Sequence, residues 1–408
     1  MPTRRTILAC APFALAGCLS RFESGEGDSE PGSDSGGSDQ TSGWTTYRGD
    51  VAATGRADTT LSESFEVERL WGWDDPIATP PDHPRLARST PGVVPTTDAV
   101  YATAADPEFA PVAVDRTDPG LRWTLDDLTD ARDGEYDRTP TPVVADGDTF
   151  VHTSYRLWRI DDGNPVWAQD TGLWVGDELI GDRSELYTTT AVARIDPEGG
   201  ETIDTERARE SGSTAGLAVG SDGAVQALRV GDTPDGLLVG YDERWNVDWE
   251  IELPGQPPRR APALWDGTAI VVAGGETIGV DIADGELRWR TDDRGFRSGV
   301  AVDGEGTVYA PHETDVLVAL DGPDGTRQWS SEVDRPLEAF VGDQQHVFPP
   351  IVANDAVVLG GPGGLAIFDR ASGTLRWHED LALAGAPAVA FGDVYTITEA
   401  GVIAIRGQ

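Results

Sequence analysis

The sequence predicts an all-β fold, an eight-bladed β-propeller of four-stranded antiparallel blades that is closed by an N-terminal strand. Three observations lead to this prediction. An Asp, a Gly four residues later and a Trp four residues after that recur along the chain. Most copies follow one another at roughly 40 to 48 residues, a period typical of stacked supersecondary units. The last copy lacks one strand, and a strand-like segment near the N-terminus can supply it.

The recurring residues form a marker whose chemistry suits a turn followed by a buried strand. Clear copies are Asp281-Gly285-Trp289, Asp321-Gly325-Trp329 and Asp369-Gly373-Trp377, and altered copies are Asp115-Gly120-Trp123, Asp161-Gly163-Trp167, Asp196-Gly200 and Asp242 with Trp249. We interpret the Asp and Gly as turn residues rather than metal ligands, because Asp accepts backbone N–H groups and Gly adopts left-handed conformations. We interpret the Trp side chains as packing between blades rather than as a platform for a quinone or a carbohydrate.

Each unit is expected to contain four short strands. In one unit, the pair Asp303-Gly304 starts a hairpin, the second strand includes 308–310, and the third includes 317–320 and ends at the marker Asp. Such Asp-Gly pairs tolerate the positive φ angles of tight hairpins, and the same reasoning assigns 303–307 to a hairpin rather than to a calcium loop. The Trp lies on the fourth strand. First strands are expected to start near Thr90, Thr139, Leu173, Ser213, Arg260, Gly295, Val347 and Gly385.

The two ends of the chain are expected to complete one blade together. The last unit stops at Gln408, one strand short, while Phe65–Trp71 has the pattern of a fourth strand with no first three strands before it. Eight blades over residues 44–408 then have about 45 residues each, a usual blade size.

The repeat resembles the pyrroloquinoline-quinone-like propeller repeat, a WD40-like architecture. The segment 44–50 (Trp-Thr-Thr-Tyr-Arg-Gly-Asp), followed by Gly55, resembles the lead-in of propellers similar to the lipoprotein of the bacterial β-barrel assembly machinery. The resemblance covers nearly all of residues 44–408. It implies the fold, and it implies either a non-catalytic binding scaffold or a quinone-dependent dehydrogenase.

The first 43 residues predict export and a lipid anchor. Arg4 and Arg5 lie in a segment close to a twin-arginine export signal, and Leu15-Ala16-Gly17-Cys18 matches a lipobox. Residues 1–17 are therefore expected to be a signal peptide, with lipid attached to Cys18 and the propeller held outside the cytoplasm at the cell membrane. The alternative is a signal that is cleaved or retained without lipid. Residues 18–43, rich in Ser, Gly, Asp and Glu, are expected to form a disordered tether.

The charge predicts a halophilic protein. The chain has 71 acidic and 31 basic residues, a net charge of −40, and every basic residue is Arg. Molar salt would screen this repulsion, so the composition is typical of an extreme halophile. The alternative is an acidic protein that binds cationic partners. Nucleic acid is disfavoured as a partner, because no basic stripe exists to neutralise phosphates.

Catalytic signals are weak. For a dehydrogenase, the resemblance implies pyrroloquinoline quinone with calcium in the channel, a catalytic Asp and often a disulfide between adjacent cysteines. The two cysteines, Cys10 and Cys18, both lie in the signal region, and no calcium-binding set is recognisable. We therefore expect no catalytic residue, no metal and no cofactor, with the quinone enzyme as the alternative. The five histidines have no metal-ligand spacing, and each is interpreted as a surface or loop residue: His83, His152, His312, His346 and His378.

A binding surface, if present, is expected on the loops that join a fourth strand to the next first strand. Three of these connections are long, Asp74 to Ser89, Asp126 to Arg138, and Ser331 to His346, and all emerge on one face of a propeller. The alternative is that they are only tolerated surface loops. A monomer with an unidentified protein or small-molecule partner is expected. The residues expected on this face are Trp73, His83, Tyr136, Arg259, Arg260, Phe340, Gln344 and His346.

Overall fold

The computed structural model describes residues 49–50, 53–72, 92–104, 110–125, 141–145, 148–153, 156–170, 179–181, 186–188, 192–206, 212–230, 236–253, 255, 258–331, 336–342, 346–398 and 401–408. The chain divides into two compact units, Met1–Ser38 and Asp39–Gln408, and the described residues belong to the second. The predicted export signal with Arg4 and Arg5, the lipobox with Cys18, and the predicted tether lie outside the described residues. Among the helices that are described, none has the length and apolar character needed to cross a membrane.

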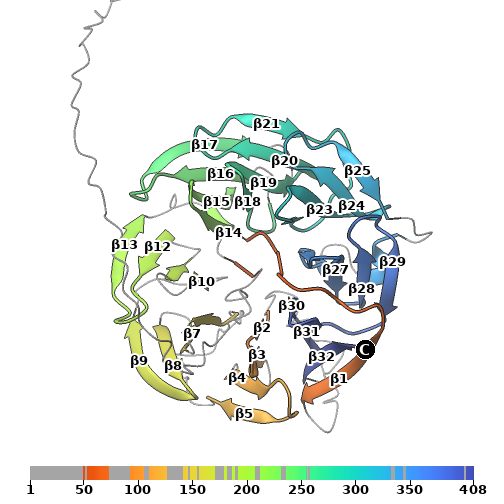
Figure 1. Cartoon of the computed structure of the whole chain (residues 1–408). Coiled ribbons are helices and arrows are strands. Elements are labelled where there is room, and N and C mark those ends of the chain that lie inside the picture. Colours follow the sequence, from red (N-terminus) through yellow and green to blue (C-terminus); the bar gives the residue numbers. More distant parts are fainter. Residues whose placement is uncertain are drawn as a thin grey trace, which may run out of the picture. The chain divides into compact units, whose positions relative to one another are not determined.

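Eight four-stranded antiparallel sheets form a ring of blades, which confirms the predicted fold class (Figure 1). We number the blades 1 to 8 in chain order and call their strands a to d from the centre of the ring outward. Seven of the eight predicted starts of the first strands precede an observed strand a, and Ser213 lies within one, β14. The strands a are β2 (Val94–Pro95), β6 (Val143–Ala145), β10 (Leu179–Gly181), β14 (Gly212–Gly220), β18 (Ala263–Trp265), β22 (Ala301–Val302), β26 (Ile351–Val352) and β30 (Ala388–Ala390).

In blades 1 to 7 the remaining strands follow in order of sequence, and strand c ends at or next to the marker Asp. The strands b are β3 (Ala99–Ala104), β7 (Asp148–Thr153), β11 (Leu186–Thr188), β15 (Gly223–Val230), β19 (Thr268–Ala273), β23 (Thr307–His312), β27 (Ala356–Gly361) and β31 (Asp393–Thr398). The strands c are β4 (Ala110–Asp115), β8 (Arg156–Asp161), β12 (Val192–Ile195), β16 (Gly236–Tyr241), β20 (Glu276–Asp281), β24 (Val316–Asp321), β28 (Gly364–Asp369) and β32 (Gly401–Gly407). The strands d are β5 (Leu121–Thr124), β9 (Asn164–Asp170), β13 (Thr202–Glu206), β17 (Val247–Leu253), β21 (Leu287–Arg290), β25 (Arg327–Ser330), β29 (Leu375–Glu379) and β1 (Phe65–Trp71). A short helix, α1 (Glu338–Val341), lies in the connection from blade 6 to blade 7.

The ring is closed by the N-terminal strand, as predicted. Strand β1 pairs antiparallel with β32, so that Phe65 lies opposite Gly407 and Val67 opposite Ile405. The sheet order β1-β32-β31-β30 makes β1 strand d of blade 8. The Phe65 ring also lies 5.6 Å from the Trp377 ring of blade 7. Pairing between the two ends of the chain covers sheet edges that would otherwise be free.

The marker Asp residues form turns, which confirms their interpretation. Asp369 Oδ1 accepts hydrogen bonds from the N–H groups of Ala371 and Ser372, at 3.1 and 2.9 Å. The Arg376 guanidinium and the Ser372 hydroxyl bind the same carboxylate and hold the pKa of Asp369 at about 2, below its ordinary value. Carboxylates at equivalent positions accept backbone N–H groups in the same way, at Asp115, Asp196, Asp242 and Asp281.

The marker Trp packs between neighbouring blades, as predicted, and its ring contacts the marker Gly of the next blade. Gly325 has a φ of 71° and lies directly against the Trp289 ring of the preceding blade, so that a Cβ at this position would collide with the ring. Trp289 Nε1 donates a hydrogen bond of 2.6 Å to the carbonyl of Gly322 in the same turn. The other Trp and Gly pairs in contact are Trp123 with Gly163, Trp167 with Gly200, Trp249 with Gly285, and Trp329 with Gly373. Apolar clusters between blades complete the core.

A stretch before β1, Ala53 to Leu61, crosses the interior of the ring (red to orange in Figure 1). We call it the N-terminal segment. Its backbone pairs with the ends of strands a: the Val302 N–H donates to Thr54 O, and the Ala57 N–H to Val352 O, both at 2.8 Å. It therefore lies where strands a and b turn, on one side of the ring.

Candidate functional site on the loop face

The order of the strands gives the ring two different faces. Because neighbouring strands are antiparallel, the connections from strand d to the next strand a emerge on the same side as the turns between strands b and c. We call this side the loop face, and the opposite side, with the a–b and c–d turns, the turn face. Backbone bonds join loops across the loop face: the Glu313 N–H donates to Gly295 O at 2.9 Å, and the Leu337 N–H to Glu313 O at 3.1 Å. The predicted binding face is the loop face.

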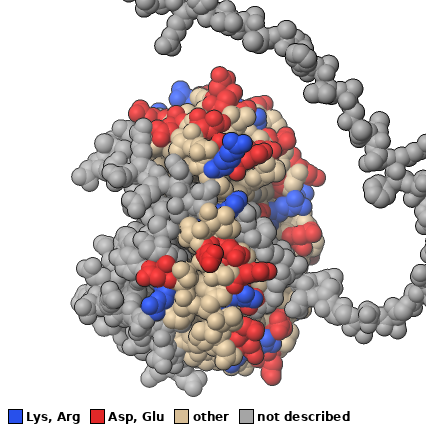
Figure 2. Space-filling model, turned by 90° about the vertical axis from the view of Figure 1, so that its left-hand side faces the viewer, with Lys and Arg blue, Asp and Glu red and all other residues tan. Residues whose placement is uncertain are grey.

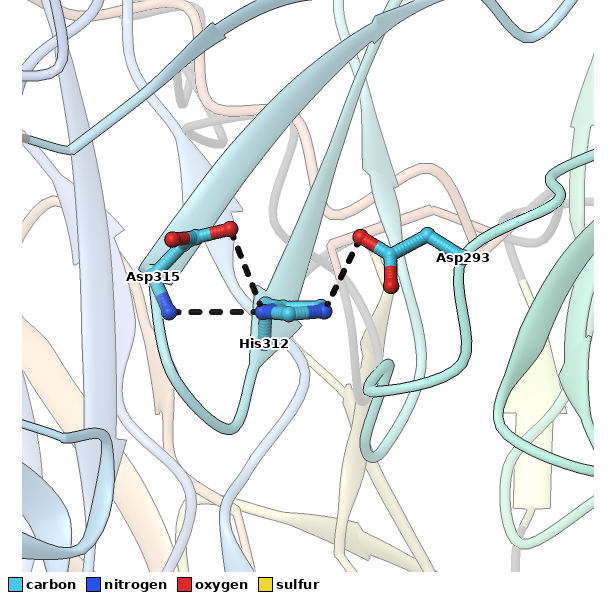
Figure 3. Close-up of side chains that lie close together, drawn as sticks. All are labelled: Asp293, His312 and Asp315. Atoms are coloured by element: carbon cyan, nitrogen blue, oxygen red, sulfur yellow. Dashed lines mark hydrogen bonds and ion pairs between the residues drawn. The ribbon is translucent and has the colours of Figure 1, made fainter.

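Three ionisable side chains come together on the loop face between blades 5 and 6 (Figure 3). Asp293 belongs to the connection between these blades, His312 ends strand b of blade 6, and Asp315 lies in the following turn. His312 Nε2 lies 3.4 Å from Asp293 Oδ2, and His312 Nδ1 lies 3.4 Å from Asp315 Oδ2. The two carboxylates therefore flank opposite edges of one imidazole. We call these three residues the Asp–His–Asp cluster.

The imidazole of His312 is held tightly and is only 4% exposed. The Phe296 ring meets it edge-on at 5.0 Å, and a Cβ at Gly295 would collide with it, so only glycine permits this close crossing of the loop. The N–H of Asp315 donates to His312 Nδ1 at 3.3 Å. Nδ1 thus faces two backbone N–H groups of the turn that follows, those of Thr314 and Asp315. Nε2 itself has no hydrogen-bond partner within the described structure.

Arg327 neutralises the Asp–His–Asp cluster from strand d of blade 6. Its Nη2 lies 2.5 Å from Asp293 Oδ2, and its Nη1 lies 2.9 Å from Asp315 Oδ2. One guanidinium therefore takes up both carboxylates, in the place where a bound cation would have to balance them. Because this guanidinium already pairs with both carboxylates, the group as it stands does not fit a divalent metal ion.

Further ion pairs extend this network across the boundary between the blades. Arg294 Nε lies 2.8 Å from Oε1 of Glu276, a residue of blade 5 that is 6% exposed, and Arg297 pairs with Glu313 of blade 6. The loop of 293–297 is fixed on both sides, since the N–H groups of Gly295 and Phe296 donate to Gly275 O. The result is a rigid, charged surface in which acids and arginines alternate.

Some of the predicted binding residues are accessible on the loop face, and one of them is buried. Arg259 is exposed and Arg260 half-buried on the connection before β18, and His346 is half-buried before β26. Phe340 was expected on the surface, which is wrong: it is 3% exposed, because α1 turns its ring inward against Phe368 and His378. The other predicted positions lie outside the described residues: Trp73, His83, Tyr136 and Gln344.

Sequence reasoning missed the Asp–His–Asp cluster. The interpretation of every histidine as a surface or loop residue is wrong for His312 and for His152, which is 2% exposed on strand b of blade 2. Burial lowers the pKa of His152 to about 4, since a buried imidazolium is poorly solvated. An available signal was the position of both histidines near the end of an apolar strand rather than within a polar loop.

These features define a closed β-propeller whose blades are joined by Trp side chains and whose loop face carries an internally neutralised charged network. The chain belongs to the family described as outer membrane protein assembly factor BamB, which matches residues 188–408, just over half of the sequence.

Solved structures with the same fold include proteins of different activities. BamB from Moraxella catarrhalis is 15% identical with a TM-score of 0.54, covering 78% of this chain and 93% of that protein. The quinohemoprotein alcohol dehydrogenase from Comamonas testosteroni is 13% identical with a TM-score of 0.63, covering 89% of this chain and 80% of that enzyme. The computationally designed Ika8 protein is 15% identical with a TM-score of 0.58, covering 78% of this chain and 96% of that protein. No protein of curated function matches the sequence. At such identities the likeness establishes the fold alone.

Proposed function

We propose that this chain is a lipid-anchored, extracytoplasmic propeller that binds a protein partner through its loop face and catalyses no reaction. The observation that carries the proposal is the double ion pair of Arg327 with Asp293 and Asp315. Through this pair, both carboxylates of the Asp–His–Asp cluster are neutralised within the protein. Rigid surfaces with alternating charges select partners by electrostatic complementarity, whereas a catalytic centre needs a group free to act.

Membership of the BamB family supports a binding function. The family is named for the assembly of outer membrane proteins. For this chain, Arg4 and Arg5 as a twin-arginine signal, cleavage after Gly17 and lipid on Cys18 together would place the propeller outside the cytoplasm at a membrane surface. Replacing Arg4 and Arg5 by Lys is then expected to retain the precursor inside the cell.

The charge distribution supports a halophilic setting for this binding. Acidic side chains with arginines between them are spread over the described surface in Figure 2 rather than gathered into one patch. In molar salt the screening length is only about 3 Å, so long-range repulsion between an acidic propeller and its partner is weak and short-range pairing decides specificity.

The second candidate function is a quinone-dependent dehydrogenase, which the likeness to the Comamonas enzyme favours. The residues of this chain do not fit that cofactor. Its two cysteines lie at 10 and 18 and form no adjacent pair, and Arg327 stands beside the carboxylates of the one metal-spaced group in the described structure. The N-terminal segment also crosses the interior of the ring on the turn face.

Affinity capture at high salt tests the proposal. The full chain is used to recover partners from native membranes, together with Arg259→Glu on the loop face and Arg244→Glu in the c–d turn of blade 4 as a matched control, since both arginines are exposed. We expect a partner that is recovered with the wild type and the control, and about tenfold less with Arg259→Glu, because charge reversal at an interface weakens binding strongly. Equal recovery with both variants would contradict the assignment of the loop face. Stoichiometric quinone uptake with calcium and substrate turnover would favour the dehydrogenase.

A further inference from the structure

A second feature lies on the turn face, away from the Asp–His–Asp cluster. A pocket of about 390 Å³ opens between the a–b turns of blades 6 and 7 and the N-terminal segment. Its volume lies in the range of small-ligand sites, which extends from roughly 300 to 1,000 Å³. The groups around it are mainly polar, so its ligand should be recognised through hydrogen bonds and charge. The polar side chains that line it are Arg56, Asp303, Glu305, Asn354 and Arg370.

Arg56 supplies the first cation of this pocket, and its backbone is held in place. The residues on either side of it are bonded to blade 7: the Ala57 N–H donates to Val352 O, and the Val352 N–H donates to Gly55 O, both at 2.8 Å. The guanidinium lies over Gly304, where a Cβ would be only 2.7 Å from Nη1. Within the described structure this guanidinium has neither a hydrogen bond nor an ion pair. It is a positioned cation in a protein whose acids outnumber its bases by more than two to one.

Arg370 is the second cation, and its carboxylate contacts are long. Its Nη1 lies 3.4 Å from Asp303 Oδ2 and its Nη2 lies 3.6 Å from Glu305 Oε2. Elsewhere in the protein, Arg376 approaches its two carboxylates to 2.5 and 2.6 Å. Arg370 therefore retains unused donor capacity on the side of the pocket.

The carboxylate of Asp303 is shared with three donors of its own hairpin, and its hydrogen bond from Arg370 is long. Its Oδ1 accepts the N–H groups of Glu305 and Thr307, and its Oδ2 accepts the hydroxyl of Tyr309 at 2.9 Å. This hydrogen bonding and the 3% exposure of Asp303 fix it as part of the hairpin. Glu305, in contrast, has a side chain that is 78% exposed and can be displaced by a competing carboxylate.

We propose that this pocket binds a carboxylate group, held between Arg56 and Arg370. Two guanidinium groups offer the planar, paired donors that match a carboxylate. The two arginines face Asp303 and Glu305, and the exposed Glu305 can move away from Arg370, so the site suits a monoanion better than a phosphate dianion. The site goes beyond the proposed function, since it lies on the face opposite to the loop face. Its ligand is an acidic side chain of a bound protein or a free organic acid.

Titration of the full chain in about 1 M salt, where long-range repulsion is screened, tests the pocket. The probes are a short capped peptide with one Glu, the same peptide with Gln, acetate and inorganic phosphate, followed by ligand-observed NMR. We expect saturable binding of the Glu peptide and at least tenfold weaker binding of the Gln peptide, because the neutral amide loses the charge-assisted bonds. Binding of acetate as tight as that of the Glu peptide identifies a free acid as the ligand, and much weaker binding identifies a protein side chain.

Three variants assign the binding to this site. Arg56→Gln removes an exposed cation and should weaken binding of the Glu peptide about tenfold or more, while Arg290→Gln on β21 should leave it unchanged. Gly304→Ala keeps the charge but displaces the guanidinium, so it should also weaken binding. Equal binding by Arg56→Gln and wild type, equal binding of the Glu and Gln peptides, no carboxylate binding, or a preference for phosphate would each overturn the proposal. Partner capture through Arg259 is a separate measurement, so failure of one site is distinguishable from failure of the other.

Discussion

Replacing Trp by Phe should change the stability of the propeller differently at two equivalent tryptophans that pack between blades. Trp289 Nε1 donates a 2.6 Å hydrogen bond to Gly322 O of the next blade. Trp167 occupies the same position on β9, but its buried Nε1 has no hydrogen-bond partner in the described structure. Trp289→Phe therefore loses a bond and leaves a carbonyl unpaired, whereas Trp167→Phe removes a buried donor that was already unsatisfied.

The expected magnitudes follow from this difference. Loss of the hydrogen bond and the unpaired Gly322 carbonyl should lower the free energy of unfolding of Trp289→Phe by about 1 to 2 kcal/mol, in addition to the packing lost with the smaller ring. For Trp167→Phe, the smaller ring costs some packing, but removal of the unsatisfied N–H offsets it, so we expect a change within about 0.5 kcal/mol. Urea titration of both variants at one molar salt concentration, with unfolding followed by circular dichroism, measures the two free energies. Equal destabilisation would show that the interblade hydrogen bond contributes nothing beyond ring packing.

Three further predictions concern the ends of the chain and one marker turn. Deleting residues 1–43 should leave a stable propeller, whereas deleting 1–73 removes β1 and should lower Tm sharply or cause aggregation; equal Tm values in the same salt would contradict closure by this strand. Cys18→Ser should release the protein from membranes or leave it uncleaved, while Cys10→Ser should do neither, and fractionation with detection of lipid distinguishes them. Because the pKa of Asp369 is lowered from 3.8 to about 2, its ionised form stabilises the fold fully above about pH 4, and this contribution is lost as the pH falls towards 2. Asp369→Asn should therefore lower stability at neutral pH and flatten the loss between pH 4 and 2, as measured by Tm against pH.

The fold could be predicted because its determinants are local and repeated. The turn at Asp369 depends on the carboxylate and on N–H groups two and three residues away, so a single stretch of sequence contains the whole interaction. The contact of Trp289 with Gly325 joins two blades, yet it recurs at equivalent positions, which makes a long-range contact visible as a period. Closure was predictable because Phe65–Trp71 has the pattern of a fourth strand without its partners.

The Asp–His–Asp cluster could not be predicted, because it occurs at a single boundary between blades and its residues come from separate segments of the chain. Asp293 and His312 meet because the intervening loop turns back over the ring, which requires Gly295 at the crossing and Phe296 against the imidazole. In a chain with 71 acidic residues, a histidine near carboxylates is common, so composition gave no signal. The burial of Phe340 could not be predicted for a related reason. The single turn of α1, within a connection between blades, points its ring into the protein.

The two faces of the ring now differ in a way that bears on where ligands bind. On the loop face, Arg327 takes up both carboxylates at 2.5 and 2.9 Å, so a partner meets a surface whose charges are already paired and must gain affinity from shape and rim contacts. On the turn face, the Arg56 guanidinium is positioned by backbone pairing with Val352 but has no paired anion in the described structure. A partner that removes water from a paired network pays a free-energy cost, which only new bonds to the partner can offset. An anion that reaches Arg56 adds an ion pair to this guanidinium without breaking an existing one. A small ligand should therefore prefer the turn face, and a protein that covers a large area is the kind of partner that the loop face can hold.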